Sequence, residues 1–380
     1  MALALASCQP KPDYAGIGRA GQTIGREARI EAETYRLYLD SDAVGLVASV
    51  VRGDRAYVSG FGHVTPASAA APDGRTLVRL QSISKLLDSD LLSALVADGR
   101  VKLSDPLARY APSGWRGPPA KKGAPVITLL NLATHTSGLP REAAVIAGKP
   151  GPQAEAERWE WLATQTRLPP AGRGALYSNI GFDLLGDALA AAAKAPYEAA
   201  LATTVTQPLG MADTTAQPTP QQCARLLAPD PLRHPFPCID QSWEAASGGI
   251  YSTADDMALW MEAQLAAGAA ADRRRISQAT YVQRASLATA VGLDHAGPAE
   301  AIGLAWIELA PTSDHPRVLE KTGGGDGFLT YIVIDPASRV GVFVAFDNVS
   351  GRRLPVVAAD ANALVGLLAA AAEPANAVTR

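Results

Sequence analysis

The sequence predicts a mixed α/β (α+β) fold, in which an antiparallel sheet is flanked by helices and carries an inserted all-helical lobe. Strand-like segments gather near the two ends of the chain. The long middle part instead has apolar residues at helical spacing between Pro- and Gly-rich connections. The chain closes with a long apolar helix. A sheet built from both ends of the chain would therefore receive the middle part as an insertion.

Strands are expected early and late in the chain. Residues 43–52 and 55–64 are rich in apolar and β-branched residues and flank a tight Gly-Asp turn. Residues 302–309, 328–335 and 340–347 have the same character, and the segment PASR joins the last two as a hairpin. These segments would form the sheet.

Helices are expected in the middle of the chain and at its end. Residues 179–194 have apolar positions at helical spacing. Residues 251–265 form another such segment, in which Thr253 is placed to cap the helix N-terminus. Residues 356–372 form the closing helix.

These elements divide the chain into three parts. Residues 1–28 are expected to be a leader and tether. Residues 29–105 together with 296–380 would form the sheet-containing α/β lobe, and residues 106–295 the mainly helical lobe.

Composition excludes several classes of protein. The chain has 380 residues, 48% hydrophobic and 19% charged, with a net charge of −3, which is typical of a globular protein. No basic block stands out, so no nucleic-acid partner is expected. The longest apolar stretch, 361–372, is shorter than the roughly 20 residues that a membrane span needs. The oligomeric state is left open.

Cys8 follows Leu5, Ala6 and Ser7 in a pattern that resembles the lipobox of bacterial lipoproteins, in which the cysteine carries the lipid. The upstream part is short for a secretory signal and lacks a charged region. Lipidation at Cys8 and a chance Ala- and Leu-rich start are therefore both open interpretations.

Cys223 and Cys238 are the remaining cysteines. In an oxidising compartment they could close a loop of about 15 residues as a disulfide. Two buried free thiols are the alternative.

Residues 77–105 contain a serine and a lysine that need an explanation. Apolar residues lie on nearly all sides of the predicted helix, and Lys85 is aligned with Leu92 and Val96. Such a lysine has a lowered pKa or a partner. Ser82 lies near the helix start and one turn from Lys85, so the two side chains can meet as a nucleophile and a base. Alone, the pattern arises by chance about once per 250–300 residues.

Two further motifs change that assessment. Tyr177-Ser178-Asn179 and Lys321-Thr322-Gly323 follow Ser82-x-x-Lys85 in the order Ser-x-x-Lys, Tyr-x-Asn, Lys-Thr-Gly. With these motifs, the sequence resembles the class C-type serine β-lactamase/penicillin-binding protein family. Within the family it is most similar to AmpH-type D-alanyl-D-alanine carboxypeptidase/endopeptidases, on the segments NLATHTSGLPRE, QQCARLLAPDP and KTGGGDGFLTYIVIDP.

The resemblance implies a β-lactamase/transpeptidase-like fold and a role for each motif residue. Ser82 would be the acylated nucleophile, Lys85 would hold the proton network, and Tyr177 would be the base and then the acid. Asn179 would bind the substrate amide carbonyl. The substrate carboxylate would be bound by Lys321, Thr322 and Gly323. The oxyanion hole would be formed by the backbone N–H groups of Ser82 and Gly324.

The resemblance also implies a periplasmic enzyme that acts on D-Ala-D-Ala peptides of peptidoglycan and binds β-lactams. The alternatives are a class C-type β-lactamase, a small-ester hydrolase, or a penicillin-binding sensor that acylates without turnover. Two residues depart from the family pattern. Glu142 stands where class C β-lactamases usually have a glutamine, and Glu320 precedes Lys321.

No cofactor and no metal are expected, because the five histidines are scattered without ligand spacing. His135 is the most tempting of them, and a structural role is expected for it. No Gly-x-Ser-x-Gly elbow is found, which disfavours an α/β-hydrolase.

Overall fold

The computed structural model describes residues 26–117, 126–143, 149, 151–228, 238–267, 271–347 and 352–371. Cys8 and almost all of the predicted tether lie outside these residues. The helix α1 begins at Arg26, within the last residues assigned to the tether.

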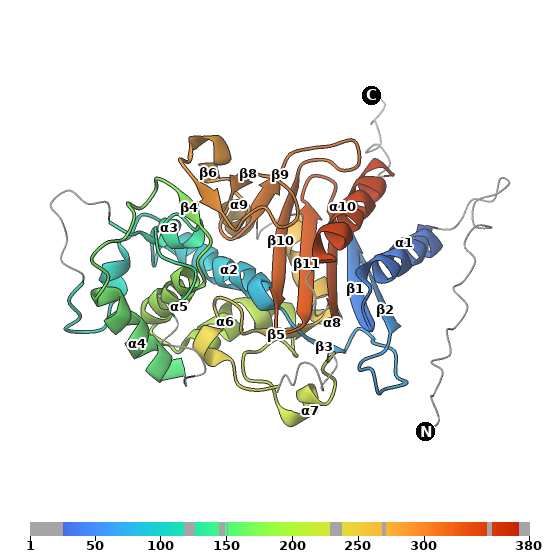
Figure 1. Cartoon of the computed structure of the whole chain (residues 1–380), viewed down its shortest axis with the longest axis horizontal. Helices are drawn as coiled ribbons and strands as arrows, with labels where there is room; N and C mark the ends of the chain where they lie inside the picture. Colours follow the sequence, from blue (N-terminus) through green and yellow to red (C-terminus); the bar gives the residue numbers. More distant parts are fainter. Residues whose placement is uncertain are drawn as a thin grey trace, which may run out of the picture.

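An eight-stranded sheet forms the larger layer of the molecule, in the order β2-β1-β12-β11-β10-β9-β8-β6 (Figure 1). Every neighbouring pair is antiparallel. The strands are β1 (Gly45–Arg52), β2 (Arg55–Gly62), β6 (Val282–Gln283), β8 (Ala299–Ile302), β9 (Ile307–Leu309), β10 (Val318–Gly325), β11 (Phe328–Asp335) and β12 (Val340–Asp347). The predicted fold class is confirmed, and the two ends of the chain meet where β1 pairs with β12.

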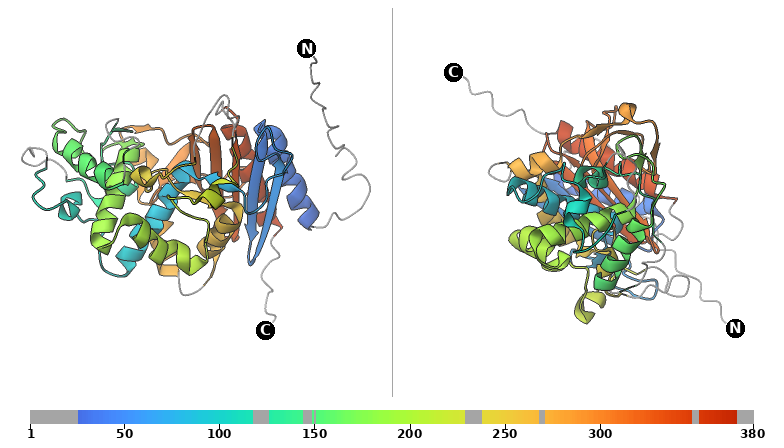
Figure 2. Two further views of the ribbon diagram at one scale, coloured as in Figure 1. Left: turned by 90° about the horizontal axis from the view of Figure 1, so that it is seen from below. Right: turned by 90° about the vertical axis from the view of Figure 1, so that its left-hand side faces the viewer.

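Helices cover both faces of the sheet because apolar residues on its strands point to both sides. The helices α1 (Arg26–Ser41) and α10 (Leu354–Ala370) pack on one face, where Leu46, Ala48 and Val50 are buried. The helix α8 (Ala254–Leu265) packs on the other face, against Val47 and Val51. Figure 2 shows α1 on the side of the sheet away from the helical part.

The helical part lies beside the sheet, with α4 and α5 on the left of Figure 1. Its longer helices are α2 (Ser84–Ala97), α4 (Gly151–Ala163), α5 (Asn179–Ala193) and α9 (Ala271–Ser277); its short ones are α3 (Leu129–Ala133), α6 (Tyr197–Leu201) and α7 (Pro220–Cys223). Two short strand pairs complete it: β3 (Leu77–Arg79) with β5 (Tyr251–Thr253), and β4 (Ala175–Leu176) with β7 (Ala290–Val291). The helix α8 and strand β6 fall within 106–295 but belong to the sheet layers, and the lobe boundaries stay a prediction.

One predicted strand is wrong in the structure. Residues 302–309 were expected to form a single strand, but they contain the end of β8 and the whole of β9, which pair with each other. The chain turns between them at Ala305, whose φ of 62° lies in the left-handed region. Trp306 fills the core at this turn, which explains why the segment is apolar without being continuous strand.

Strand β10 has a partly open edge. The strand β9 pairs with Val318, Leu319 and Glu320, and among the described residues no strand continues that pairing past Glu320. The following residues, which include Lys321 and Thr322, pair with β11 on the other side. Strand β10 contacts the 3₁₀ turn Gln81–Ile83, which precedes α2.

A disulfide joins Cys223 to Cys238, with the Cα atoms 5.6 Å apart. Replacing both cysteines by serine is expected to lower the free energy of unfolding by about 3 kcal/mol, because the cross-link restricts a loop of 15 residues in the unfolded chain. Urea unfolding of the double variant measures the change, and reduced wild type should match the variant. Equal unfolding midpoints for oxidised and reduced wild type would contradict the prediction.

In the part of the chain that the structure describes, no helix is long and apolar enough to cross a membrane.

Candidate active site

Ser82 lies in a tight 3₁₀ turn (Gln81–Ile83) that leads directly into α2. Leu80, the residue before the turn, is held by hydrogen bonds at both its N–H and its carbonyl group. The Leu80 N–H donates to the carbonyl of Ile250, and the Thr330 hydroxyl donates to the carbonyl of Leu80 at 2.8 Å. Gln81 has a φ of 53° and donates from Nε2 to the carbonyl of Gly325 at 3.0 Å. The serine is therefore held against the turn that follows β10.

Lys85 is completely buried one turn after Ser82. Its Nζ donates to Ser82 Oγ at 3.1 Å, to Asn179 Oδ1 at 2.7 Å and to the carbonyl of Ser247. Burial lowers the pKa of Lys85, while Tyr177 opposes that change and Lys321 adds to it. The lysine thus connects two of the three motifs through its own hydrogen bonds.

Tyr177 follows β4, whose parallel pairing with β7 places the ring beside Lys85. The Tyr177 N–H donates to the carbonyl of Val291 at 3.1 Å. Gly292 approaches so closely that a Cβ there would lie 2.9 Å from the Cβ of Tyr177. A side chain at that position would push the tyrosine away, so the glycine is required for this packing.

Two ammonium groups flank the Tyr177 ring. Lys85 Nζ lies 4.9 Å from the ring centroid and Lys321 Nζ lies 4.7 Å from it. Burial by itself raises the pKa of the phenol, but Lys321 and Lys85 outweigh it, and a hydrogen bond with Ser82 adds to their effect. The pKa of Tyr177 is lowered to about 7, so the phenolate is available near neutral pH.

Asn179 is the first residue of α5, and Ser178 caps that helix by accepting from the Gly181 N–H at 3.0 Å. The Asn179 side chain is fixed at both of its polar atoms. Oδ1 accepts from Lys85, and Nδ2 donates to Glu142 Oε1. Glu142, predicted as a departure from the family pattern, therefore lies in the site.

Strand β10 brings Lys321, Thr322, Gly323 and Gly324 to the same place. A Cβ on Gly323 would lie 2.6 Å from the carbonyl oxygen of Leu80, so this strand and the segment before Ser82 are in close contact. The backbone N–H groups expected for the oxyanion hole, those of Ser82 and Gly324, lie on these two adjoining segments.

Glu320 and Lys321 point to opposite faces of β10, as successive strand residues do. Glu320 is buried, and burial raises its pKa to about 8 despite the opposing effect of Lys321. No ion pair between the two side chains is formed among the described residues. The carboxyl is therefore a neutral acid at pH 7.

Two further residues contact Tyr177: His135, for which a structural role was expected, and Arg141, which no pattern in the sequence singled out. The buried ring of His135 stacks on the Tyr177 ring with centroids 4.3 Å apart, and its Nδ1 accepts from the Ser178 N–H at 3.1 Å. The guanidinium of Arg141 lies 5.0 Å from the centroid of the same ring. No spacing in the sequence relates these residues to Tyr177, because they meet it only through folding.

An ionic network centred on the buried Arg79 adjoins the 3₁₀ turn of Ser82. Arg79, the last residue of β3, forms ion pairs with Glu244 and with Asp326, the second at 2.8 Å. Asp326 belongs to the turn between β10 and β11. The network ties the strand before the nucleophile to the hairpin that carries Lys321.

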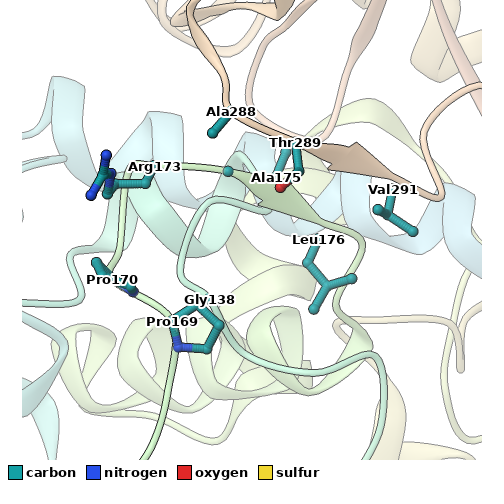
Figure 3. Close-up of a pocket in the computed structure, with 10 residues that line it drawn as sticks. Gly138, Pro169, Pro170, Arg173, Ala175, Leu176, Ala288, Thr289 and Val291 are labelled. Atoms are coloured by element: carbon teal, nitrogen blue, oxygen red, sulfur yellow. The ribbon is translucent and has the colours of Figure 1, made fainter.

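A cavity of about 210 Å³ lies next to this site, beside the β4–β7 pair (Figure 3). Leu176 and Val291 line it from the two strands, together with Pro169, Pro170 and Arg173. It contains none of the predicted catalytic residues. It adjoins them through Leu176, which precedes Tyr177, and through Val291, whose carbonyl accepts from the Tyr177 N–H.

The arrangement places a serine hydroxyl beside a tyrosine whose pKa is lowered and two cations that favour the phenolate form of that tyrosine. An acyl group could bond to Ser82 while its carbonyl oxygen lies between two backbone segments and its amide reaches Asn179. These features are what acyl transfer through a serine ester requires.

Comparisons with known proteins agree with this geometry. The model of the beta-lactamase family matches residues 28–367. The D-alanyl-D-alanine-carboxypeptidase/endopeptidase AmpH of Escherichia coli (strain K12) is 39% identical over 322 residues, which cover 81% of this chain and 80% of the relative.

Solved structures give the same answer. A beta-lactamase/D-alanine carboxypeptidase from Yersinia pestis superposes with a TM-score of 0.83 and 38% identity, over 90% of this chain and 98% of the other. A class C beta lactamase from Rhodobacter sphaeroides shares the fold, with a TM-score of 0.68 and 24% identity over 89% of this chain and 99% of the other. The resemblance seen in the three motifs is confirmed, and the chain belongs to the beta-lactamase family.

Proposed function

We propose that the protein is a serine D,D-peptidase, both carboxypeptidase and endopeptidase, that acts on D-Ala-D-Ala peptides of peptidoglycan through an acyl-enzyme on Ser82 and also binds β-lactams. The observation that carries the proposal is the contact of Ser82, Lys85 and Tyr177, with the pKa of Tyr177 lowered to about 7. The likeness to AmpH and to the Yersinia carboxypeptidase supports this substrate class.

Acylation moves one proton twice. The Tyr177 phenolate takes the proton of Ser82 as Oγ bonds to the carbonyl carbon of the penultimate D-Ala. The C–N bond then breaks, and Tyr177 gives the same proton to the leaving amine. In deacylation, Tyr177 takes a proton from water as the water oxygen bonds to the ester carbonyl carbon. The ester bond then breaks, and Tyr177 gives that proton to Ser82 Oγ. Lys85 stays protonated throughout and stabilises the phenolate form of Tyr177.

The remaining motif residues bind the substrate. The Asn179 amide, fixed by Lys85 and Glu142, would donate to the carbonyl of the substrate amide on the acyl side. Lys321 and Thr322 would hold the C-terminal carboxylate along the open edge of β10, with Gly323 letting the backbone approach. The N–H groups of Ser82 and Gly324 would stabilise the oxyanion, typically by about 2.7–4 kcal/mol per donor.

The proposed location is the periplasm, where peptidoglycan lies and where the Cys223–Cys238 disulfide is stable. A lipid anchor at Cys8 stays a prediction, because that residue lies outside the described part of the chain. The oligomeric state is not part of the proposal.

Release of D-Ala from a pentapeptide and cleavage of D-Ala-meso-diaminopimelate cross-links test the proposed function. Both are measured beside β-lactam hydrolysis on one preparation, with heat-inactivated enzyme as the blank. Peptide cleavage with slow β-lactam turnover is expected. Fast cephalosporin hydrolysis without D-Ala release would favour the class C-type β-lactamase, ester cleavage alone a small-ester hydrolase, and acylation without any turnover a penicillin-binding sensor.

Glu142→Gln is expected to raise kcat/KM for anionic β-lactams about fivefold. The Glu142 carboxylate is hydrogen-bonded to Asn179 and therefore faces the acyl side chain of a bound substrate. Repulsion between two unit charges about 4 Å apart in water is about 1 kcal/mol, which corresponds to that factor.

Steady-state hydrolysis of two β-lactams, one with an anionic and one with an uncharged acyl side chain, measures the effect of Glu142→Gln. The uncharged compound is the control and should change little. Equal gains for both compounds would show that charge repulsion is not the cause.

A further inference from the structure

A buried polar seam runs between α2 and α5, directly behind Lys85. The spacing of four residues places Asn179, Asp183 and Asp187 on one face of α5, and α2 packs against that face. We call the following residues the polar seam: Lys85, Asp88, Arg158, Asp183 and Asp187. All of them are buried.

At the end of the polar seam away from Lys85, Arg158 and Asp187 form an ion pair. Arg158, on α4, donates from Nε to Asp187 Oδ2 at 2.9 Å and from a terminal nitrogen to the other oxygen of that carboxylate. A further guanidinium nitrogen donates to the carbonyl of Trp243 at 2.8 Å. Because both oxygens of the Asp187 carboxylate accept from the guanidinium, the charge of Arg158 balances that of Asp187.

Burial strongly disfavours the charged form of Asp88. It is completely buried one turn after Lys85, beside the hydroxyl of Tyr197. Burial raises its pKa well above the ordinary range, and the neighbouring Tyr197 and Lys85 do not compensate. Asp183 is therefore the one seam carboxylate left to balance Lys85.

Asp183 and Lys85 both lie beside Ser247. The carbonyl of Ser247 accepts from Lys85 Nζ. The hydroxyl of Ser247 donates to the carbonyl of Glu244 at 3.4 Å and lies close enough to Asp183 to lower the pKa of that carboxyl. Asp183 is only 9% exposed, and no donor among the described residues reaches its Oδ1. Burial raises the pKa of Asp183, but Arg158, Ser247 and Lys85 limit the rise to about 6, so the carboxylate is mostly ionised at pH 7.

We propose that Asp183 is a positioning residue for the acylation step: its carboxylate holds Lys85 as the ammonium ion and so keeps Tyr177 in the phenolate form that removes the proton of Ser82. This inference rests on the proposed acyl transfer and adds a residue that contacts neither substrate nor Ser82.

The physical reason is that Lys85 and Tyr177 share one proton. With the proton on Lys85 the pair is an ammonium and a phenolate; with the proton on Tyr177 both groups are neutral, and the base is lost. Lys321 also faces the pair and favours the phenolate, but it disfavours the ammonium of Lys85. Asp183 favours the ammonium, so it opposes the combined effect of burial and Lys321.

The other charged or titratable groups that face Asp183 cannot stabilise the ammonium form of Lys85 in its place. Arg158 is bound to Asp187, and burial disfavours the charged forms of Asp88 and Tyr197, because it raises the pKa of each well above its ordinary value. Glu244 also lies near Asp183, but it forms an ion pair with Arg79.

Asp183→Asn tests the inference, because it removes the charge and keeps the shape. The Cζ resonance of Tyr177 in protein labelled with ¹³C-tyrosine reports its ionisation, and Tyr177→Phe assigns the signal. The midpoint is expected to rise by about one pH unit, and the rate of acylation by a fluorescent penicillin below pH 7 to fall about tenfold.

Asp88→Asn is the matched control. It replaces a buried acid, whose charged form burial disfavours, with a neutral amide in the same seam, so the Tyr177 midpoint should stay where it is. Thermal unfolding shows whether each variant is folded. If Asp183→Asn does not fold, Ser247→Ala takes its place, because it removes the hydroxyl that lowers the pKa of Asp183 and should move the Tyr177 midpoint in the same direction.

A folded Asp183→Asn protein with the wild-type Tyr177 midpoint would overturn the inference, and so would an equal shift in Asp88→Asn. Failure of the proposed function looks different. In that case wild-type protein is not acylated by the penicillin, while the ¹³C titration still reports whether Asp183 controls Tyr177.

Discussion

The Ser82→Ala variant is expected to lose covalent labelling by fluorescent penicillin and to lose peptide cleavage by on the order of 10⁴-fold or more. Ser82 Oγ is the hydroxyl in contact with both Lys85 and Tyr177, so no other side chain in the site can take its place as nucleophile. Gel fluorescence and intact mass after incubation measure the label, and D-Ala release measures cleavage.

Removal of the hydroxyl is expected to leave the fold intact, because Ser82 is only partly buried and the backbone of Leu80 before it is held by hydrogen bonds with Thr330 and Ile250. Ser89→Ala is a suitable control, since that serine lies on α2, which follows the turn of Ser82, and its side chain donates to the carbonyl of Lys85. A Ser82→Ala protein that still takes up one equivalent of label would show that the nucleophile lies elsewhere.

The Tyr177→Phe variant is expected to lose about 10²- to 10⁴-fold in kcat/KM for acylation, which is the range for loss of a general base. Its pH profile should change as well. In wild type, acylation rises with pH through the pKa of Tyr177, about 7, because only the phenolate accepts the proton. Without the phenol this rise should disappear, so the loss is largest above pH 7 and smaller in acid.

Stopped-flow acylation by a chromogenic cephalosporin between pH 5 and 9 measures both effects for Tyr177→Phe. His135→Asn, which keeps an acceptor for the Ser178 N–H, serves as a comparison for altered packing around the ring. If Tyr177→Phe keeps a rise centred near pH 7, the titrating base is another group, and Lys85 becomes the first candidate.

Local patterns predicted the elements that carry the motifs. Strands β11 and β12 have the bounds that period and turn signals predicted, and Ser82 lies at the start of a buried helix as expected. These features depend on residues within one turn or one hairpin of each other, so the sequence contains the whole signal. The division of 302–309 into β8 and β9 was missed because a left-handed residue at Ala305 has no signature of its own.

The rest of the site depends on contacts between distant segments. Asp183 is unremarkable in the sequence, because an acid in a helix is usually on a solvated face, and only the packing of α5 on α2 buries it behind Lys85. The same holds for His135 against Tyr177 and for Arg79 between Glu244 and Asp326. Pairings of this kind need the tertiary fold, and no spacing in a single sequence specifies them.

The meeting of the two chain ends in the sheet has a consequence for the time at which activity appears. On the ribosome, Ser82 and Tyr177 emerge long before Lys321, and β1 can pair with β12 only after residue 347 has been made. Contacts so distant in sequence form slowly, since the chain between them must first be ordered. A nascent chain with this connectivity stays open and without activity until its synthesis is nearly finished. The proposed periplasmic location would require the chain to cross a membrane before it folds, and this connectivity suits that order of events.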